Sequence, residues 1–312
     1  MLSENLSIII PTKNRKEDLL ECINSIVRQN PLPFEIIVVD QSSNQDDAEQ
    51  IIKSTVNNRA RLVYWYDNKI EGLTNARNIG IKYCSGELVL FLDDDAVLLD
   101  KCIHNLLYIF ENDAKKEIGG IGLAIVNEHG SFRAVASEYI FCHGPFRSFF
   151  RYSYFQRHFS HIKQKLFLSR MIGGCACYRR AIFDQFKFDE NYKGYSSGED
   201  QIFSFVVSKK FKTYLTPLVM IEHDRLRKHR LNKGLRQRQI TFLNFYLFCA
   251  YVNKKPYNIF CYFLLVVQDL FKMLFNFYDP SVLRGVFYSY CEIFKVIFRF
   301  QTLKEGVQRN LG

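Results

Sequence analysis

The chain has 312 residues, of which 48% are hydrophobic and 15% aromatic, and its formal net charge is +10. This composition excludes a disordered chain, and the length allows one large domain or two small ones. The positive charge favours phosphates or an anionic membrane surface as partners. The nine cysteines have no regular or zinc-finger spacing, so we expect reduced thiols in the core, as in cytoplasmic proteins. Residues 1–7 lack the basic start and apolar stretch of a signal peptide.

The first hundred residues predict strands and helices in alternation. We expect strands at residues 6–10, 34–39, 62–65 and 88–92, and helices at residues 16–29, 46–55 and 73–83. Continuous apolar strands that alternate with helices are typical of a mainly parallel sheet with helices on both faces. We therefore predict an α/β domain. In such sheets, ligands bind beyond the carboxyl ends of the strands.

The most informative strand end carries three consecutive aspartates. Asp93, Asp94 and Asp95 follow the apolar run of residues 88–92. Three adjacent carboxylates at a buried strand end repel one another unless a positive charge offsets them. Mg²⁺ or Mn²⁺ commonly bridges such carboxylates to the phosphates of a substrate. A solvated acidic turn is the alternative interpretation of this feature taken alone.

Two other strand ends carry residues suited to a nucleotide. Residues 11–15 follow the first strand, and Arg15 can bind a phosphate through two hydrogen bonds. Asp40 follows the second strand, where its carboxylate could accept hydrogen bonds from a base or a ribose, or could instead cap the next helix. Because three such strand ends are expected at one rim, we favour a common ligand site over three local features.

The middle of the chain has a less regular pattern. Residues 121–126, 134–141 and 171–178 predict strands, and residues 146–168 predict a loop with a helix. Gly173 and Gly174 lie within the last of these strands, where a backbone or a ligand could approach closely. Glu199 and Asp200 open a helix that extends to residue 208. Acidic residues in a first helical turn can also simply complement the helix dipole.

The last third of the chain is basic and then aromatic. Residues 225–238 are rich in Arg and Lys, and apolar segments follow at residues 240–252, 259–278 and 286–300. Polar residues recur at helical spacing in the last two segments, which argues against a transmembrane helix. We predict a domain at residues 1–224 and an amphipathic helical region at residues 225–312 that lies in a membrane interface. Packing against the first domain or a partner subunit is the alternative.

Four segments taken together resemble a known family. The segments SIIIPTKNR, IVVD, GLTNARNIG and FLDDD, at residues 7–15, 37–40, 72–80 and 91–95, are similar in order and spacing to the family 2 glycosyltransferases, which have the GT-A fold. The two glycines at 173–174, the acidic pair at 199–200 and the Glu-His-Asp triplet at 222–224 fall where that family has its acceptor and metal elements. The resemblance covers residues 6–223.

The resemblance implies a role for each candidate residue. The nucleotide would contact Pro11, Thr12, Asn14, Arg15, Asp40, Arg77, Asp93 and Asp94. The cation, Mn²⁺ or Mg²⁺, would be held by Asp95 and His223. The acceptor would lie against Gly173, Gly174 and Glu199, with Asp200 as the general base. The implied donor is a UDP- or dTDP-sugar.

The chemistry of sugar transfer explains why these groups are needed. Negative charge grows on the leaving diphosphate, where a cation stabilises it, and the acceptor hydroxyl needs a base. Only one base and no enzyme nucleophile are evident, so we expect direct displacement with inversion. The expected acceptor is a glycan or lipid-linked glycan in polysaccharide biosynthesis, and the expected location is the inner face of the cell membrane.

Two alternatives to a sugar transferase stay open. One is a metal-dependent nucleotidyltransferase, which also uses paired aspartates and metal. The other is a non-catalytic, membrane-docked protein that binds nucleotide sugars. No nucleic-acid motif accompanies the basic run at residues 225–238, so we expect no nucleic-acid partner. The sequence leaves the formation of a homo-oligomer open.

Overall fold

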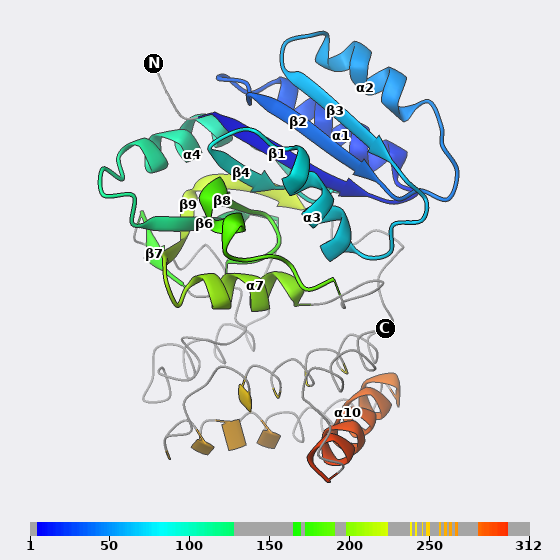
Figure 1. The fold of residues 1–312 in the computed structure, drawn as a ribbon, viewed down its shortest axis with the longest axis vertical. Helices are drawn as coiled ribbons and strands as arrows, with labels where there is room; N and C mark the ends of the chain where they lie inside the picture. Colours follow the sequence, from blue (N-terminus) through cyan, green and yellow to red (C-terminus); the bar gives the residue numbers. More distant parts are fainter. Residues whose placement is uncertain are drawn as a thin grey trace.

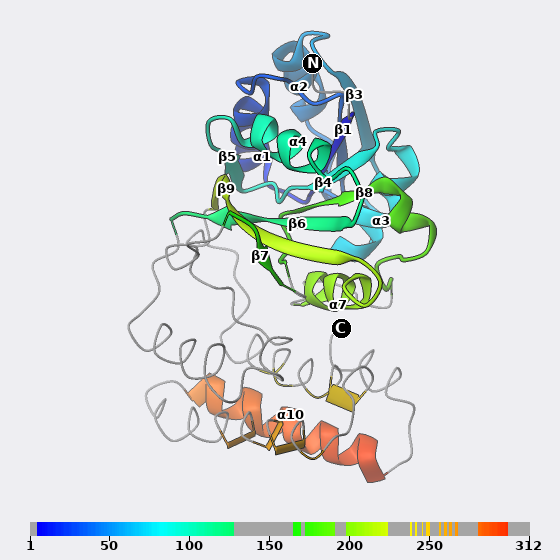
Figure 2. The same cartoon turned by 90° about the vertical axis from the view of Figure 1, so that its left-hand side faces the viewer.

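The computed structural model describes residues 5–127, 165–169, 172–190, 198–223 and 280–298, together with isolated residues between 238 and 267. Within these ranges the chain forms a nine-stranded mixed sheet with helices on both faces (Figures 1 and 2). The strand expected at residues 134–141 lies outside the described residues. Most of the segments expected at 146–168, 225–238 and 240–278 lie outside them as well.

One half of the sheet is parallel. Its strands are β1 (Leu6–Thr12), β2 (Glu35–Asp40), β3 (Arg61–Tyr66) and β4 (Leu88–Phe91), which lie in the order β3-β2-β1-β4. Every residue of β1, β2 and β4 is buried. Burial on both faces is the reason that these strands read as continuous apolar runs in the sequence. The four strands confirm the predicted positions to within two residues at each end.

Three helices connect the parallel strands, and they confirm the sequence prediction. They are α1 (Lys16–Val27), α2 (Ala48–Val56) and α3 (Leu73–Tyr83). Side chains alternate across β1, so that Ile8 and Ile10 pack with α1 and α2 while Ile9 packs with α3. Gly80 allows α3 to approach the sheet closely, because a Cβ there would lie 2.4 Å from Ile9 Cγ2.

The other half of the sheet is mixed. Its strands are β5 (Ala96–Leu98), β6 (Ile118–Ile125), β7 (Phe167–Leu168), β8 (Ala176–Arg179) and β9 (Lys212–His223). β8 joins the two halves through antiparallel pairing with β4 and β6, and β9 runs parallel to β6 but antiparallel to β5 and β7. The expected mainly parallel arrangement therefore holds only for the first four strands.

Some expected elements in this half differ from the structure. The strand predicted at residues 171–178 begins only at Ala176, because the glycines before it belong to a turn with Gly173 at φ 79°. Phe167 and Leu168 form the edge strand β7 instead of a loop or helix, since they pair with β9. The sequence did not predict β5 or the helix α4 (Cys102–Glu111), which packs in the core with α1.

Further helices among the described residues are η3 (Arg180–Asp184), α7 (Glu199–Val207) and α10 (Pro280–Phe298). α7 confirms the predicted helix, and it lies on the same face of the sheet as α3 (Figure 2). α10 begins six residues before the helical segment expected at 286–300. None of the helices in the described part of the chain combines the length and apolar character needed to cross a bilayer.

Seven cysteines of the described residues are free, and five of them are buried, as the sequence predicts.

Candidate functional site

The carboxyl ends of β1, β2 and β4 meet at one rim of the sheet, and the aspartates after β4 lie there. Asp94 is buried, and its carboxylate accepts hydrogen bonds from Thr12 Oγ1 at 2.8 Å and from Arg15 Nη1 at 3.0 Å. Burial raises the pKa of Asp94 to about 6, although Arg15 and Thr12 act in the opposite direction. Asp94 therefore ties the end of β1 and the start of α1 to the loop after β4.

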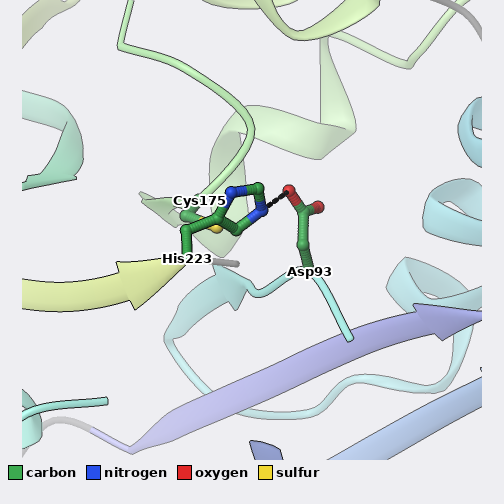
Figure 3. A group of neighbouring side chains, drawn as sticks. All are labelled: Asp93, Cys175 and His223. Carbon is green, nitrogen blue, oxygen red and sulfur yellow. Dashed lines mark hydrogen bonds and ion pairs between the residues drawn. The ribbon is translucent and has the colours of Figure 1, made fainter. Parts of the chain in front are cut away.

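Asp93 and Asp95 face His223, the last residue of β9. The Nε2 atom of His223 is 3.2 Å from Asp93 Oδ2 and 3.0 Å from Asp95 Oδ1 (Figure 3 shows the first contact). These residues meet because β5, which follows the aspartates directly, pairs with the end of β9 and places Ala96 opposite His223. Burial lowers the pKa of His223, but hydrogen bonds to the two carboxylates outweigh it and raise that pKa to about 9.

Arg77 on α3 joins this rim to α7. Its side chain is only 2% exposed, with Nη1 2.9 Å from Glu199 Oε1 and Nη2 3.5 Å from Asp93 Oδ1. The guanidinium also lies 5.7 Å and 5.3 Å from the ring centroids of Phe91 and Phe188. Burial lowers the pKa of Arg77, but Glu199 and Asp93 raise it above its ordinary value, so the side chain stays charged.

Glu199 and Asp200 occupy the first turn of α7. Burial, with a further contribution from Asp200, raises the pKa of Glu199 to about 8. Burial also raises the pKa of Asp200, with Arg77 opposing it and Asp93 adding to it. A Cβ on Gly174 would lie 3.6 Å from Asp200 Oδ2 and 3.6 Å from Asp93 Oδ2, so the bare glycine stands between the two carboxylates. A carboxylate with a raised pKa is suited to act as a general base.

Asp40, at the end of β2, is held at both carboxylate oxygens. Oδ1 accepts a hydrogen bond from the backbone N–H of Ser42 at 2.8 Å, and Oδ2 accepts one from the Tyr64 hydroxyl at 2.7 Å. The following helix begins at Ala48, and its N-cap is Asp47. The alternative that Asp40 caps this helix is therefore wrong.

The loops after β1 and β2 are fixed against each other. Asn14, at φ 55°, donates its backbone N–H to Ser42 Oγ at 2.8 Å, and its side-chain Oδ1 accepts the backbone N–H of Ser43 at 2.9 Å. Pro11 is buried within β1 and in register with Val39 of β2. Most residues predicted to bind the nucleotide thus lie on a connected rim, and Arg77, which is also predicted to bind it, is buried between this rim and Glu199.

Sequence reasoning missed three residues of this region: Ser42, Tyr64 and Cys175. The Cys175 sulfur, one Asp93 oxygen and one His223 ring nitrogen all lie within 4.8 Å of one another (Figure 3). Cys175 directly follows Gly173 and Gly174, where the sequence predicts close approach of a ligand or backbone. Its place next to these glycines could therefore have marked it as a site residue. Tyr64 had no comparable signal, because only the pairing of β3 with β2 brings it beside Asp40.

The donor atoms at the rim suit a divalent cation. Asp93 and Asp95 supply carboxylate oxygens and His223 an imidazole nitrogen, with 3.0–3.2 Å between the nitrogen and each oxygen. Oxygen and imidazole ligands in this number are acceptable to Mn²⁺, and the carboxylates also to Mg²⁺. A cation bound there would replace the positive charge that a protonated His223 now supplies.

Comparison with known proteins identifies a family profile and curated relatives that match this chain. The profile of Glycosyl transferase family 2 matches residues 7–186, which is more than half of the 312 residues. A curated relative, the GalNAc(5)-diNAcBac-PP-undecaprenol beta-1,3-glucosyltransferase of Campylobacter jejuni, is 34% identical over 134 residues, or 38% of this chain and 43% of the relative. The chain therefore matches less than half the length of this relative.

Solved structures show the same fold at low sequence identity. The structure of S. aureus TarS 1-349 in complex with UDP-GlcNAc has a TM-score of 0.55 at 18% identity, and the match covers 80% of this chain and 68% of the TarS 1-349 chain. The mannosyltransferase PcManGT from Pyrobaculum calidifontis, in complex with GDP-Man and Mn²⁺, has a TM-score of 0.58 at 14% identity, covering 99% and 85%. These structures share the fold, and the family profile over residues 7–186 confirms the resemblance in the motifs: the chain belongs to glycosyl transferase family 2.

Proposed function

We propose that this protein is a metal-dependent, inverting transferase that moves a sugar from a UDP- or dTDP-sugar to a hydroxyl of a glycan or lipid-linked glycan. The observation that carries the proposal is one connected network of ionisable side chains. Asp93 and Asp95 face His223, and Arg77 links Asp93 to Glu199 beside Asp200. Arg77 thus connects the group that would hold the cation to the acidic pair that would supply the base, which supports the proposal.

On the donor side, we assign the nucleotide to the rim formed by the ends of β1 and β2. Asp40 is oriented by Ser42 and Tyr64, which leaves its carboxylate in a fixed position for a base. Asp93, Asp95 and His223 would hold Mn²⁺ or Mg²⁺, which when bound stabilises the negative charge that develops on the diphosphate. The UDP-GlcNAc bound by TarS and the Mn²⁺ bound by PcManGT support this choice of donor and cation.

On the acceptor side, we assign Asp200 as the general base. The acceptor oxygen attacks the anomeric carbon as the bond to the diphosphate breaks, and the hydroxyl proton passes to the Asp200 carboxylate. Direct attack of this kind inverts the anomeric configuration. Glu199 is engaged by Arg77 at 2.9 Å, which makes Asp200 the better candidate for the proton. The absence of a side chain at Gly174 leaves room beside both Arg77 and Asp200. A Cβ there would lie 3.2 Å from Arg77 Nη2 and 3.6 Å from Asp200 Oδ2.

The two alternative functions differ from this proposal in what they release. A nucleotidyltransferase would release inorganic pyrophosphate, and a non-catalytic binding protein would release nothing. Asp200, half-buried and separated by 107 positions in the sequence from Asp93, has no evident use in either alternative. The curated relative whose name describes glucosyl transfer to an undecaprenol-linked glycan supports a lipid-linked acceptor.

We further propose that the region after residue 224 docks on a membrane surface. On α10, Phe287, Tyr288 and Phe294 are more than half exposed, whereas Val286 and Ile293 are buried. Aromatic side chains that face outward from an amphipathic helix are suited to the interface of a bilayer. Replacing Phe287 and Phe294 by Ser should reduce sedimentation with anionic vesicles, and unchanged sedimentation would contradict membrane docking by this face.

The decisive experiment is a screen of nucleotide sugars by thermal shift, with and without Mn²⁺, followed by an assay for free nucleotide diphosphate. A UDP- or dTDP-sugar that stabilises the protein and also yields free UDP or dTDP in the presence of acceptor supports transfer. Release of pyrophosphate from a nucleoside triphosphate would instead identify a nucleotidyltransferase. Stabilisation by a donor with no product from any acceptor tested, including lipid-linked glycans, would favour the binding protein.

A further inference from the structure

A cysteine lies among the residues that we assign to the catalytic cation. The Cys175 sulfur, an Asp93 carboxylate oxygen and a His223 ring nitrogen lie within 4.8 Å of one another, and the Asp93–His223 contact itself is 3.2 Å (Figure 3). The proposed function uses the oxygens and the imidazole but has no use for the sulfur. Cys175 is buried and free, so no disulfide accounts for its position.

The three side chains come from three separate segments that the fold holds in place. Asp93 follows β4, Cys175 immediately precedes β8, and His223 ends β9. β8 pairs with β4, with Ala176 opposite Phe91, so the residues just beyond this pair are also neighbours. The register of β8 on β4 therefore fixes the position of the Cys175 sulfur beside the Asp93 carboxylate.

A thiolate, an imidazole and a carboxylate are a ligand set for a softer cation than Mg²⁺ or Mn²⁺. Zn²⁺ accepts all three, whereas Mg²⁺ and Mn²⁺ favour oxygen. Zinc bonds are about 2.3 Å to sulfur and about 2.0–2.2 Å to nitrogen and oxygen. Ligand atoms within 4.8 Å of one another need to close by only about 1 Å to reach such a geometry.

We propose that Asp93, Cys175 and His223 form a binding site for a thiophilic divalent cation such as Zn²⁺, which overlaps the site assigned to the catalytic cation. As the cation binds, the Cys175 thiol loses its proton to solvent and a metal–sulfur bond forms. Because Asp93 and His223 would serve both cations, Zn²⁺ and Mn²⁺ exclude each other. The thiophilic cation therefore acts as a competitive inhibitor of the transfer proposed above.

The test uses Co²⁺, a spectroscopic substitute for Zn²⁺, on the full chain under reducing conditions and without donor or acceptor. Thiolate bound to Co²⁺ gives an intense near-ultraviolet charge-transfer band that oxygen and nitrogen ligands do not give. We expect this band in the wild type, its loss on addition of Zn²⁺, and its absence from Cys175→Ser. The affinity of Cys175→Ser for Co²⁺ should be lower by at least about tenfold. Removal of a side chain that only hydrogen-bonds to a metal ligand already costs that much, so removal of a ligand should cost no less.

A matched control is Cys84→Ser, which changes another buried cysteine, at the C-terminal cap of α3, where the Sγ atom donates to the Ile81 carbonyl oxygen at 3.1 Å. This variant should keep the full band. A wild type without the band overturns the proposal even if no variant folds, and so does a band that persists in folded Cys175→Ser. His223→Gln should weaken Co²⁺ binding, and unchanged binding in that variant also contradicts the proposal.

The spectroscopic result is independent of the proposed reaction. A band in a protein that transfers no sugar would leave the thiophilic site standing and remove the transferase assignment. Transfer supported by Mn²⁺ in a protein that shows no band would leave the transferase assignment standing and remove the thiophilic site. Where both hold, excess Mn²⁺ should relieve inhibition by Zn²⁺, and inhibition that Mn²⁺ does not relieve would contradict a shared site.

Discussion

The two halves of the sheet hold their site residues in different ways. In the parallel half, Thr12, Asp40 and the aspartates lie at the rim because each terminates or directly follows a strand. In the mixed half, Gly174, Asp200 and His223 come from three segments that meet only through long-range pairing and through Arg77. The proposed nucleotide rim is thus built from local sequence, whereas the proposed cation site and acceptor side both depend on the assembled fold. Substitutions on the two sides should therefore have separable effects on binding and on catalysis.

The largest effect is expected from Asp200→Asn on the transfer side. Removal of the base should reduce kcat by a factor on the order of 10²–10⁴, while calorimetry should show nearly unchanged affinity for the nucleotide. Asp184→Asn, an exposed aspartate in η3, is the matched control and should retain activity. Activity of Asp200→Asn within about threefold of the wild type would be too high for the loss of a general base, and would remove Asp200 from that role.

A dependence on pH should sharpen the same assignment. Burial raises the pKa of Asp200, and a base works only when deprotonated. The value of kcat/KM should therefore fall as pH falls, by about tenfold per pH unit below that pKa. The acid limb should lie above the ordinary aspartate value of about 3.9. Donor affinity measured over the same pH range separates loss of the base from loss of binding, and an acid limb at the ordinary value would contradict the assignment.

On the donor side, Asp95→Ala should abolish the effect of Mn²⁺ on nucleotide binding. Loss of a carboxylate that faces His223 at 3.0 Å removes a proposed ligand, and we expect at least about tenfold weaker binding of UDP in the presence of Mn²⁺. Isothermal calorimetry with and without the cation measures this directly. Asp100→Ala, an exposed residue on the same segment, serves as the control. Equal affinity of Asp95→Ala and wild type with Mn²⁺ present would refute the metal assignment.

The smallest effect is expected from Tyr64→Phe. This change removes the hydroxyl that donates to Asp40 at 2.7 Å, while the Ser42 N–H still holds the other carboxylate oxygen. The effect on donor binding should therefore be smaller than the contribution of about 1.5–3 kcal/mol from a hydrogen bond to a charged group. The KM for the donor should rise about two- to tenfold with little change in kcat. Tyr66→Phe, on the same strand, should leave KM unaltered. A change confined to kcat would mean that Asp40 acts in the transfer step and not in binding.

The accuracy of the sequence prediction follows the same division of the molecule. β1, α1, β2 and α3 were predictable because continuous apolar runs and helical spacing are local signals, and the residues after those strands followed from the strand-end rule. The extent of β9 and the three-residue strand β5 could not be read locally, because both depend on pairing with each other. The proximity of His223 to Asp93, 130 positions away, is a consequence of that pairing.

Residues whose partners are distant also resisted interpretation. Asp94, the middle aspartate, is expected from the sequence to contact the nucleotide, yet it is buried and turns inward, to Thr12 and Arg15. Cys175 looked like a core thiol, and its burial agrees, but its sulfur also faces Asp93 and His223. The local sequence pattern therefore predicts which strand end carries a side chain. The contacts of that side chain follow only from the pairing of the strands in the folded sheet.

The position of Arg15 has a consequence for how the rim behaves over repeated cycles of binding and release. Its guanidinium reaches Asp94 at 3.0 Å and Asp95 at 3.4 Å. If Asp95 binds the proposed cation, Arg15 would retain its contact with Asp94 and its place before α1. Release of the cation would then require the Asp95 carboxylate to turn back to Arg15, with no change in the backbone. A binding site that is preorganised in this way would release and bind ligand without local refolding.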